Sequence, residues 1–433
     1  MLACAIAALV YFNSLDTPFF FDDYNTVLLN PTLADPWNLR ALVLRNIARP
    51  VVNVSYAADA WFWGLSALGF HVTNAVLHVI VVGLFYGFCT RALSDASRTI
   101  GAEWPAFFAA VTFGVHPVMT SAVNYVSARS ELLAALGFLV CLTYARRAIV
   151  KGNPTAGWLA AVAGLVALGS SSSAAVLPVA ILAYDAWVLR DPGWQRRALR
   201  YYAPAMAIVG ILIAIHLPNV IAVPNVPPRG VFTHLLGEAV VSWRYVALLF
   251  VPLGQAAVHD VRWPTSFADP VGLAALAAMI AAVAFAVRAR KAHPLVALGA
   301  IWFVGVLLPT AIAPVRDGMV EHRLYLAAPG LLLAIASAAA PALAGRRTIR
   351  AAATVIVIVL SVMTFERNRD WQEPMTLWQQ AVERSPGAWQ AHLGYADLLR
   401  DVRQCERAAA SYREVLRLYP DNEAAQSGME NCR

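Results

Sequence analysis

Long apolar runs separated by short polar loops dominate the pattern along this chain. The runs from Leu273 to Val287 and from Ala351 to Thr364 contain no charged residue. With their flanks they approach the ~20 residues that an α-helix needs to cross a bilayer. The pattern predicts an all-α, polytopic membrane helix bundle with about eleven crossings. The expected crossings begin near Met1, Phe70, Trp104, Glu131, Gly157, Ala174, Tyr201, Val271, Ala300, Leu324 and Ile349.

Composition supports a chain that lies in a lipid bilayer. Of the 433 residues, 59% are hydrophobic and 14% are charged, whereas soluble domains average roughly a quarter charged residues. The formal net charge of +7 would favour a nucleic-acid partner in a soluble protein. Here the basic residues lie in short loops between apolar runs, where they act as orientation signals, so we expect no nucleic acid.

The basic loops also predict an orientation. Under the positive-inside rule, four basic clusters fall on one side, the cytoplasm. This places the N-terminus in the cytoplasm of a multi-pass protein of the plasma or inner membrane, with Met1 to Val10 as a retained first span. Val231 to Gly254 contains Glu238 and Arg244, so we expect a re-entrant or interfacial helix there. The clusters are Arg146, Arg147 and Lys151; Arg190, Arg196, Arg197 and Arg200; Arg288, Arg290 and Lys291; and Arg346, Arg347 and Arg350.

The C-terminal tail has a different pattern from the rest of the chain. From Trp371 onward it is charged, with small and aromatic residues at helix-packing intervals. The stretch Trp389 to Pro420 resembles a tetratricopeptide repeat, with Arg403 at the position where a glycine is usual. We expect a membrane domain over 1–367 and a small extracytoplasmic repeat domain over 368–433. Either a packing cap or a module that holds an acceptor accounts for this tail. Its packing positions are Ala396, Ala408 and Tyr412.

Two of the five cysteines lie in the polar tail. If the second repeat helix and the last helix pack antiparallel, Cys405 comes close to Cys432. On an oxidising outer face this predicts a disulfide, which would add roughly 3 kcal/mol to the stability of a small domain. The alternative is a pair of free thiols in a helix that frays. No C-x-x-C or similar metal-ligand spacing occurs.

The loop after the first apolar run places two carboxylates beside an aromatic cluster. Asp22 and Asp23 follow three phenylalanines at a predicted membrane surface. Partial desolvation and a neighbouring charge raise a carboxylate's pKa, which suits a general base acting on a hydroxyl. A solvated helix cap before Tyr24 is the alternative.

Two further predicted outer loops carry ionisable residues at the head of a span. The first contains His116, Arg129 and Glu131, and its polarity at that depth favours a cavity wall. Arg129 and Glu131 fit equally well as anchors at the membrane interface. His116 fits equally well as a core histidine whose ring nitrogens have hydrogen-bond partners within the protein.

The second of these loops is the more densely charged, with Glu321, His322, Arg323 and Tyr325 just before an apolar run. Arginine binds phosphate in a bidentate manner, and a neighbouring carboxylate orients it. An anionic lipid head group therefore fits this loop, whereas a snorkelling anchor would explain Arg323 alone.

The segment between the first two runs is also unusual. Arg49 precedes a stretch rich in tryptophan that we expect to form amphipathic helices in the membrane interface. A transporter is disfavoured, because the ionisable residues gather at one face and no internal two-fold repeat is evident.

These pieces, in this order, carry a family resemblance over nearly the whole chain. They are FDDY with Asn30 and Pro31, RPVVNVSYAADAWFWGL, HPVMTSAVNYVSARSELLAAL, LPVAILAYD, EHRLYLAAPG and the repeat tail. Together they resemble the transmembrane and tetratricopeptide-repeat-containing O-mannosyltransferases and their bacterial relatives, which have the type-C glycosyltransferase fold.

The resemblance implies a polyprenyl-phosphate-linked sugar as donor and an active site on the outer face. It implies an acidic residue of the first loop as the catalytic base, which maps to Asp23 or Asp22. Donor phosphate contacts map to Arg323, His322 and Arg129. A protein hydroxyl would be the acceptor, with the tail as its binding module. A glycolipid or cell-envelope polymer as acceptor, or a non-enzymatic membrane-anchored scaffold, are the alternative functions.

The chain departs from the family pattern at several polar positions. Ser171 and Ser172 stand where relatives carry a lysine and a glutamate, and Ser121 stands where they carry an acid. These losses of charge bear on the type of donor and on activity itself. No cofactor is required by the resemblance, although Asp22 and Asp23 are also candidate ligands for a divalent cation.

Overall fold

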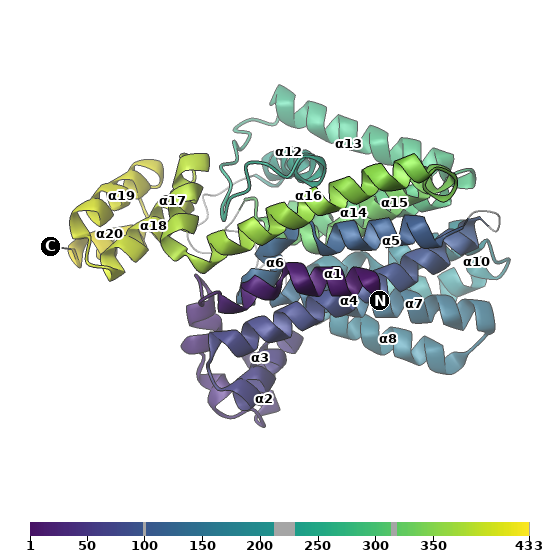
Figure 1. Cartoon of the computed structure of the whole chain (residues 1–433), viewed down its shortest axis with the longest axis horizontal. Helices are drawn as coiled ribbons and strands as arrows, with labels where there is room; N and C mark the ends of the chain where they lie inside the picture. Colours follow the sequence, from purple (N-terminus) through teal and green to yellow (C-terminus); the bar gives the residue numbers. More distant parts are fainter. Residues whose placement is uncertain (98–100, 212–229, 313–317, 433) are drawn as a thin grey trace.

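The computed structural model describes residues 1–97, 101–211, 230–312 and 318–432, and every regular element in these ranges is helical. The long helices lie roughly side by side, and the C-terminal tail projects at one end (Figure 1). The principal helices of the bundle are α1 (Leu2–Val10), α4 (Ala67–Ala96), α5 (Glu103–Gly114), α6 (Thr120–Asn124), α7 (Arg129–Lys151), α8 (Pro154–Leu168), α9 (Leu177–Ala183), α12 (Val231–Phe250), α13 (Pro270–Arg288), α14 (Pro294–Ile312), α15 (Leu324–Gly345) and α16 (Arg347–Gln372).

Seven helical segments within the described ranges are long and apolar enough to cross a membrane. The bent pair formed by Glu103–Gly114 and Pro117–Asn124, with an angle of 49°, makes eight if it is one span. These eight segments account for the crossings expected near Phe70, Trp104, Glu131, Ala174, Val271, Ala300, Leu324 and Ile349. The seven are Ala67–Ala96, Val126–Lys151, Ser172–Leu189, Pro270–Lys291, Pro294–Ile312, Glu321–Gly345 and Arg347–Gln372.

The other three expected crossings are less complete. The crossings at Met1 and Gly157 fall on shorter apolar segments, Leu2–Asp16 and Pro154–Leu168. The crossing at Tyr201 runs on into residues outside the described ranges, so the total of eleven stays a prediction. The α12 segment forms one helix of 20 residues that is not among the seven.

Small residues let the central helices approach closely. A Cβ atom on Gly299 of α14 would lie 2.3 Å from the carbonyl oxygen of Gly330 in α15, so only glycine fits there. Close backbone contact of this kind is how helices associate in lipid, where apolar surfaces alone give little preference. Trp302 is fully buried beside this contact, and its indole N–H donates to the Leu326 carbonyl at 2.9 Å.

The tail and the first long loop lie at the same end of the bundle (Figure 1). The loop carries α2 (Leu39–Arg45) and α3 (Pro50–Trp63), and the tail carries α17 (Pro374–Arg384), α18 (Trp389–Asp401), α19 (Cys405–Leu418) and α20 (Glu423–Glu430). Helix α16 continues without a break across the boundary expected at residue 367, so the polar helices begin with α17.

Successive helices of the tail pack against one another around a small core of their own. Ala396, Ala408 and Tyr412 are buried, as their packing positions predicted. Between α18 and α19, Arg403 adopts the left-handed conformation, with φ of 61°. The assignment of this tail as a tetratricopeptide-repeat domain stays a prediction.

Candidate functional site

A cavity of about 1010 Å³ opens at the end of the bundle where the first loop, the second loop and the tail meet. Its polar wall comes from both loops, from the short helix Ser172–Val176 and from the short helix Glu321–Arg323, whereas α9 and α14 give it an apolar side. A partly apolar cavity with a few converging polar groups is typical of a ligand site. Its polar and charged lining residues include Asp22, Asn25, Thr26, Arg49, Ser121, Tyr125, Ser127, Glu131, Ser171, Ser172, Ser173, His322 and Arg323.

The two neighbouring aspartates differ sharply in their surroundings. Asp22 lines the cavity and accepts a hydrogen bond from the Tyr125 hydroxyl at 3.0 Å. Asp23 is fully buried, and its two carboxylate oxygens accept bonds from the backbone N–H of Phe20 at 3.0 Å, and from the backbone N–H and the hydroxyl of Ser127 at 2.7 and 2.6 Å. Asp22 can therefore reach a ligand, whereas Asp23 ties the two loops together.

Burial and hydrogen bonding act on Asp23 in opposite directions. Burial raises the pKa of Asp23 to about 7, although the hydrogen bonds from Ser127 and Phe20 lower it. Because the carboxylate holds donors from both Phe20 and Ser127, it fixes the position of the first loop against the second.

Two arginines line the cavity from separate elements. Arg49 stands immediately before α3, and Arg323 belongs, with His322, to the short helix that leads into α15. The Glu131 carboxylate interacts electrostatically with both arginines and accepts a hydrogen bond from Ser171 at 3.0 Å. Arg49, from the loop before α3, and Arg323, from the short helix before α15, thus line one cavity, as a phosphate site requires.

Three other predicted site residues lie away from the lining. Arg129 is fully buried, with Nη2 2.6 Å from the Asp59 carboxylate. His116 Nδ1 accepts a hydrogen bond from the Val118 backbone N–H, and its Nε2 donates to the Leu249 carbonyl. Tyr325 shares a hydrogen bond with His78 at 2.8 Å. These residues hold helices together, and we assign them no contact with a ligand.

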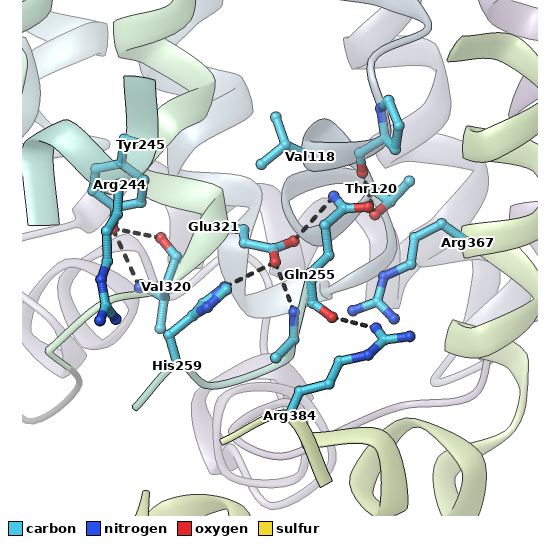
Figure 2. A network of polar contacts seen from close by, with 12 residues as sticks. Val118, Thr120, Arg244, Tyr245, Gln255, His259, Val320, Glu321, Arg367 and Arg384 are labelled. Atoms are coloured by element: carbon cyan, nitrogen blue, oxygen red, sulfur yellow. Dashed lines mark hydrogen bonds and ion pairs between the residues drawn. The ribbon is translucent and has the colours of Figure 1, made fainter. Parts of the chain in front are cut away.

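Glu321 is also buried, and Figure 2 shows its carboxylate in a polar network with His259 and Gln255. Its Oε1 accepts hydrogen bonds from the backbone N–H of Ala256 at 2.8 Å and from His259 Nε2 at 2.9 Å. The extended segment containing these partners also accepts a hydrogen bond from Arg384 of α17, at the carbonyl of Gln255. Glu321 therefore anchors the short helix that carries His322 and Arg323 and links it to the tail.

Aromatic rings line the path from the tail into the cavity. Trp378 of α17 stacks on Phe21 with a centroid distance of 4.6 Å and an interplanar angle of 22°. Phe21 in turn lies 6.5 Å from Tyr125, whose ring centroid is 6.0 Å from that of His322. Phe21 adopts a left-handed backbone conformation, with φ of 50°, a sparsely populated state that tends to occur at functional sites.

Sequence reasoning missed the residues that complete this wall. Tyr125 and Ser127 lie in the same motif as Arg129 and Glu131, and their alternation with small residues in a polar loop was the available signal. Trp371, Leu377 and Trp378 give no comparable signal, because at helix spacing they look like core residues of the tail.

The aspartate pair does not fit a shared cation site. Both oxygens of Asp23 are already directed at Phe20 and Ser127. Among the described residues, no group of three or more histidine, cysteine, aspartate or glutamate side chains is placed to hold a metal ion. We derive no step through a cation.

Several known proteins that this chain resembles are named protein O-mannosyl-transferases. No protein-family model matches the chain. Human protein O-mannosyl-transferase TMTC1 is 21% identical over 505 aligned positions, which cover 99% of this chain and 56% of that protein. This chain is similar to the TMTC proteins. The match to tmtc2 of Xenopus laevis is 27% identical over 172 residues, covering 36% of this chain and 20% of that protein, and mouse TMTC3 is 29% identical over 159 residues, covering 34% and 16%.

The chain thus spans about half the length of human TMTC1 and a smaller share of the other two. Among solved structures, the crystal structure of ArnT from Cupriavidus metallidurans bound to undecaprenyl phosphate is 15% identical, with a TM-score of 0.43 over 99% of this chain and 77% of that one.

Proposed function

We propose that this chain is an integral-membrane glycosyltransferase that moves a sugar from a polyprenyl-phosphate donor to a hydroxyl group of a protein acceptor. The observation that carries the proposal is the meeting of Asp22, Arg49 and Arg323 on one cavity with an apolar wall. A free carboxylate, phosphate-binding cations and a lipid-compatible surface are the parts that such a reaction needs. The likeness to the O-mannosyl-transferases supports the same class of reaction.

The donor phosphate is assigned to the cationic part of the cavity. Arg323 and Arg49 bear the positive charge, and His322, whose ring lies 6.0 Å from that of Tyr125, adds a polar group to the lining. The polyprenyl chain then follows the apolar wall formed by Val179 and by residues of α14, including Val304 and Leu308. An apolar wall of this kind suits a hydrocarbon chain better than a polar ligand.

Asp22 is the proposed catalytic base. The acceptor oxygen attacks the anomeric carbon, and its proton passes to the Asp22 carboxylate. The bond between the anomeric carbon and the phosphate oxygen breaks, and the lipid phosphate leaves with the electron pair while the arginines stabilise its charge. Attack opposite the leaving group inverts the anomeric configuration.

The tail is the proposed acceptor module. Leu377 and Trp378 of α17 line the same cavity as Asp22, so a polypeptide held by the tail would reach the base directly. The basic clusters favour the outer face of the plasma or inner membrane as the location of this end of the bundle. If the acceptor is instead a glycolipid or envelope polymer, Trp378 serves only as a wall.

The test of this function compares three single substitutions in purified protein supplied with radiolabelled polyprenyl-phosphate sugars and an envelope extract. Asp22→Asn should lower transfer by about 10²- to 10⁴-fold, the range for loss of general base catalysis. Asp16→Asn is the matched control, because Asp16 is an exposed acid of the same loop that does not line the cavity. Asp23→Asn should lower protein stability more than it lowers the rate of the folded fraction.

Full transfer by Asp22→Asn would refute this base. Absence of transfer by the native protein across mannosyl and other donors would favour a non-enzymatic scaffold. Label recovered in lipid rather than in protein would identify the glycolipid alternative. A Trp378→Ala variant should then leave the apparent KM for the acceptor unchanged, whereas it should raise that KM about tenfold if the tail holds a protein.

A further inference from the structure

A second cavity, of about 600 Å³, lies toward the opposite end of α14 from the proposed active site. The first cavity reaches Leu308 and Ile312 near the C-terminal end of this helix, whereas the second is bounded by Ile301 and by basic residues that precede the helix. Val179 and Ile301 line both cavities, so the two share one apolar wall. The second is lined by Val179, Leu182, Ala183, Ala186, Trp187, Arg190, Trp194, Arg290, Lys291 and Ile301.

Three cations gather at this second cavity without a carboxylate to balance them. Across the described ranges, the structure gives no ion pair to Arg190, Arg290 or Lys291. On the same predicted face, Arg146 pairs with Asp95 at 2.5 Å, and Arg197 pairs with Asp185 at 2.7 Å. The three cations of the cavity have no such carboxylate among the described residues, so their charge is available to a ligand.

Backbone contacts hold two of these cations in place. The Arg190 guanidinium donates to the carbonyl of Trp187 at 3.2 Å and to the carbonyl of Lys291 at 2.5 Å, which bridges the two sides of the cavity. Arg190 takes a left-handed backbone conformation, with φ of 53°, to do so. Arg290 donates to the Val287 carbonyl at 2.9 Å and lies 5.9 Å from the Trp187 ring centroid.

Each guanidinium keeps donors for a ligand. Arginine has five N–H donors, of which these backbone contacts use two in Arg190 and one in Arg290. Arg190, Arg290 and Lys291 line one part of the second cavity, which we call its charged mouth. Arginines held in place beside a lysine are well suited to bind a phosphate group. A basic pocket between helices at the membrane surface is also where anionic lipid head groups bind.

The rest of the cavity wall is apolar. Leu182 and Ala186, together with the shared pair Val179 and Ile301, extend from the cations toward the first cavity. Trp187 and Trp194 flank the charged mouth, and tryptophan is enriched at the level of lipid head groups. Charge at the mouth and hydrocarbon behind it match an amphiphile better than a free anion.

We propose that this second cavity binds an anionic phospholipid. Its phosphate lies among Arg190, Arg290 and Lys291, and one acyl chain lies between α9 and α14 and ends beside the wall that Val179 and Ile301 share with the first cavity. The bound lipid fills the space behind that wall, and so supports the surface along which a polyprenyl chain would lie. The lipid site itself does not depend on the proposed transferase activity.

Native mass spectrometry of the purified full-length protein tests this site with phosphatidylglycerol as the probe and phosphatidylcholine as the neutral comparison. The test variant combines Arg190→Gln, Arg290→Gln and Lys291→Gln. The matched control combines Lys151→Gln, Arg346→Gln and Arg347→Gln, which removes the same charge from exposed positions of the same predicted face. We expect apparent affinity for phosphatidylglycerol to fall about fivefold per lost cation at the cavity, and so roughly a hundredfold in the test variant.

A second variant separates the lipid chain from the charge. Ala186→Phe keeps all three cations but fills the apolar part of the cavity, so it should also weaken phosphatidylglycerol binding, and melting curves establish that each variant is folded. Equal losses in the test and control triples would mean a diffuse charge effect and would overturn the proposal. So would displacement of the lipid by millimolar inorganic phosphate, or unchanged binding in Ala186→Phe, since either outcome means that the head group alone is recognised.

Discussion

The buried carboxylate of Asp23 in the first loop accepts two hydrogen bonds from Ser127 of the second loop, from its backbone N–H at 2.7 Å and from its hydroxyl at 2.6 Å. This contact ties together the two loops that line the polar side of the cavity. The stability of the protein should depend on pH, because burial raises the pKa of Asp23 to about 7 in the folded protein, above its ordinary value of 3.8.

A raised carboxylate pKa means that the folded state binds the proton more tightly than the unfolded state. The stabilising contribution is complete below about pH 4, falls as pH rises, and is lost above about pH 7. Asp23→Asn removes this titration. Melting temperatures measured from pH 4 to pH 8 should therefore fall more steeply in the native chain than in Asp23→Asn, and parallel curves would show that Asp23 titrates as it does when unfolded.

Tyr125→Phe tests the orientation of the proposed base. It removes the hydroxyl that donates to Asp22 at 3.0 Å and keeps the ring that packs near Phe21. Loss of a hydrogen bond to a charged group costs roughly 1.5–3 kcal/mol, so kcat should fall by about tenfold to a hundredfold while the KM for the donor stays the same. A rise in KM with unchanged kcat would mean that Tyr125 contacts the donor instead.

Much of this arrangement follows from where charges are tolerated in a membrane protein. Asp22 follows the first apolar run, whereas Glu131 and Arg323 stand at the head of later ones, and at each of these places an ionisable group needs a polar environment. The sequence thus predicts that these loops form the polar part of the molecule. The structure places all three on one cavity.

The sequence does not separate residues with the same local pattern but different neighbours. Arg129 and Arg323 each head an apolar run, yet Arg129 is fully buried against Asp59, from a helix about seventy residues earlier in the chain, whereas Arg323 lines the cavity. Asp22 and Asp23 are neighbours in one turn, which directs the Asp22 carboxylate into the cavity and the Asp23 carboxylate toward Ser127. Trp378 reaches the cavity because the tail folds back, which local pattern cannot indicate.

Glu321→Gln tests the anchoring of the phosphate-binding helix. The amide keeps the shape of the side chain but weakens the bonds from Ala256 N–H and His259. Because His322 and Arg323 follow directly, we expect the KM for the donor to rise about tenfold with a smaller change in kcat. Steady-state kinetics with Glu383→Gln, an exposed glutamate of α17, gives the control. A variant that only lowers the melting temperature would limit Glu321 to a structural role.

The two tail cysteines remain candidates for a disulfide. Both are free thiols in the structure, and the neighbouring Cys405 side chain raises the pKa of the Cys432 thiol. Oxidation should close the bond without moving the backbone far and add roughly 3 kcal/mol of stability to the tail. Mass spectrometry after alkylation, with and without reductant, counts the free thiols, and Cys405→Ser serves as control. Alkylation of both cysteines in protein taken from an oxidising compartment would contradict the disulfide.

Arg403 offers a gain in stability. Its N–H bonds to the Arg400 carbonyl and the N–H of Gln404 bonds to the Leu399 carbonyl, both at 2.8 Å, a helix ending that usually has glycine at the position of Arg403. A side chain in the left-handed conformation costs roughly 1–2 kcal/mol. Arg403→Gly should therefore stabilise the tail by about 1 kcal/mol, measured as a higher melting temperature. Arg403→Ala keeps the strained backbone and should bring no such gain, so equal melting temperatures for the two variants would place the effect in the lost guanidinium rather than in the backbone.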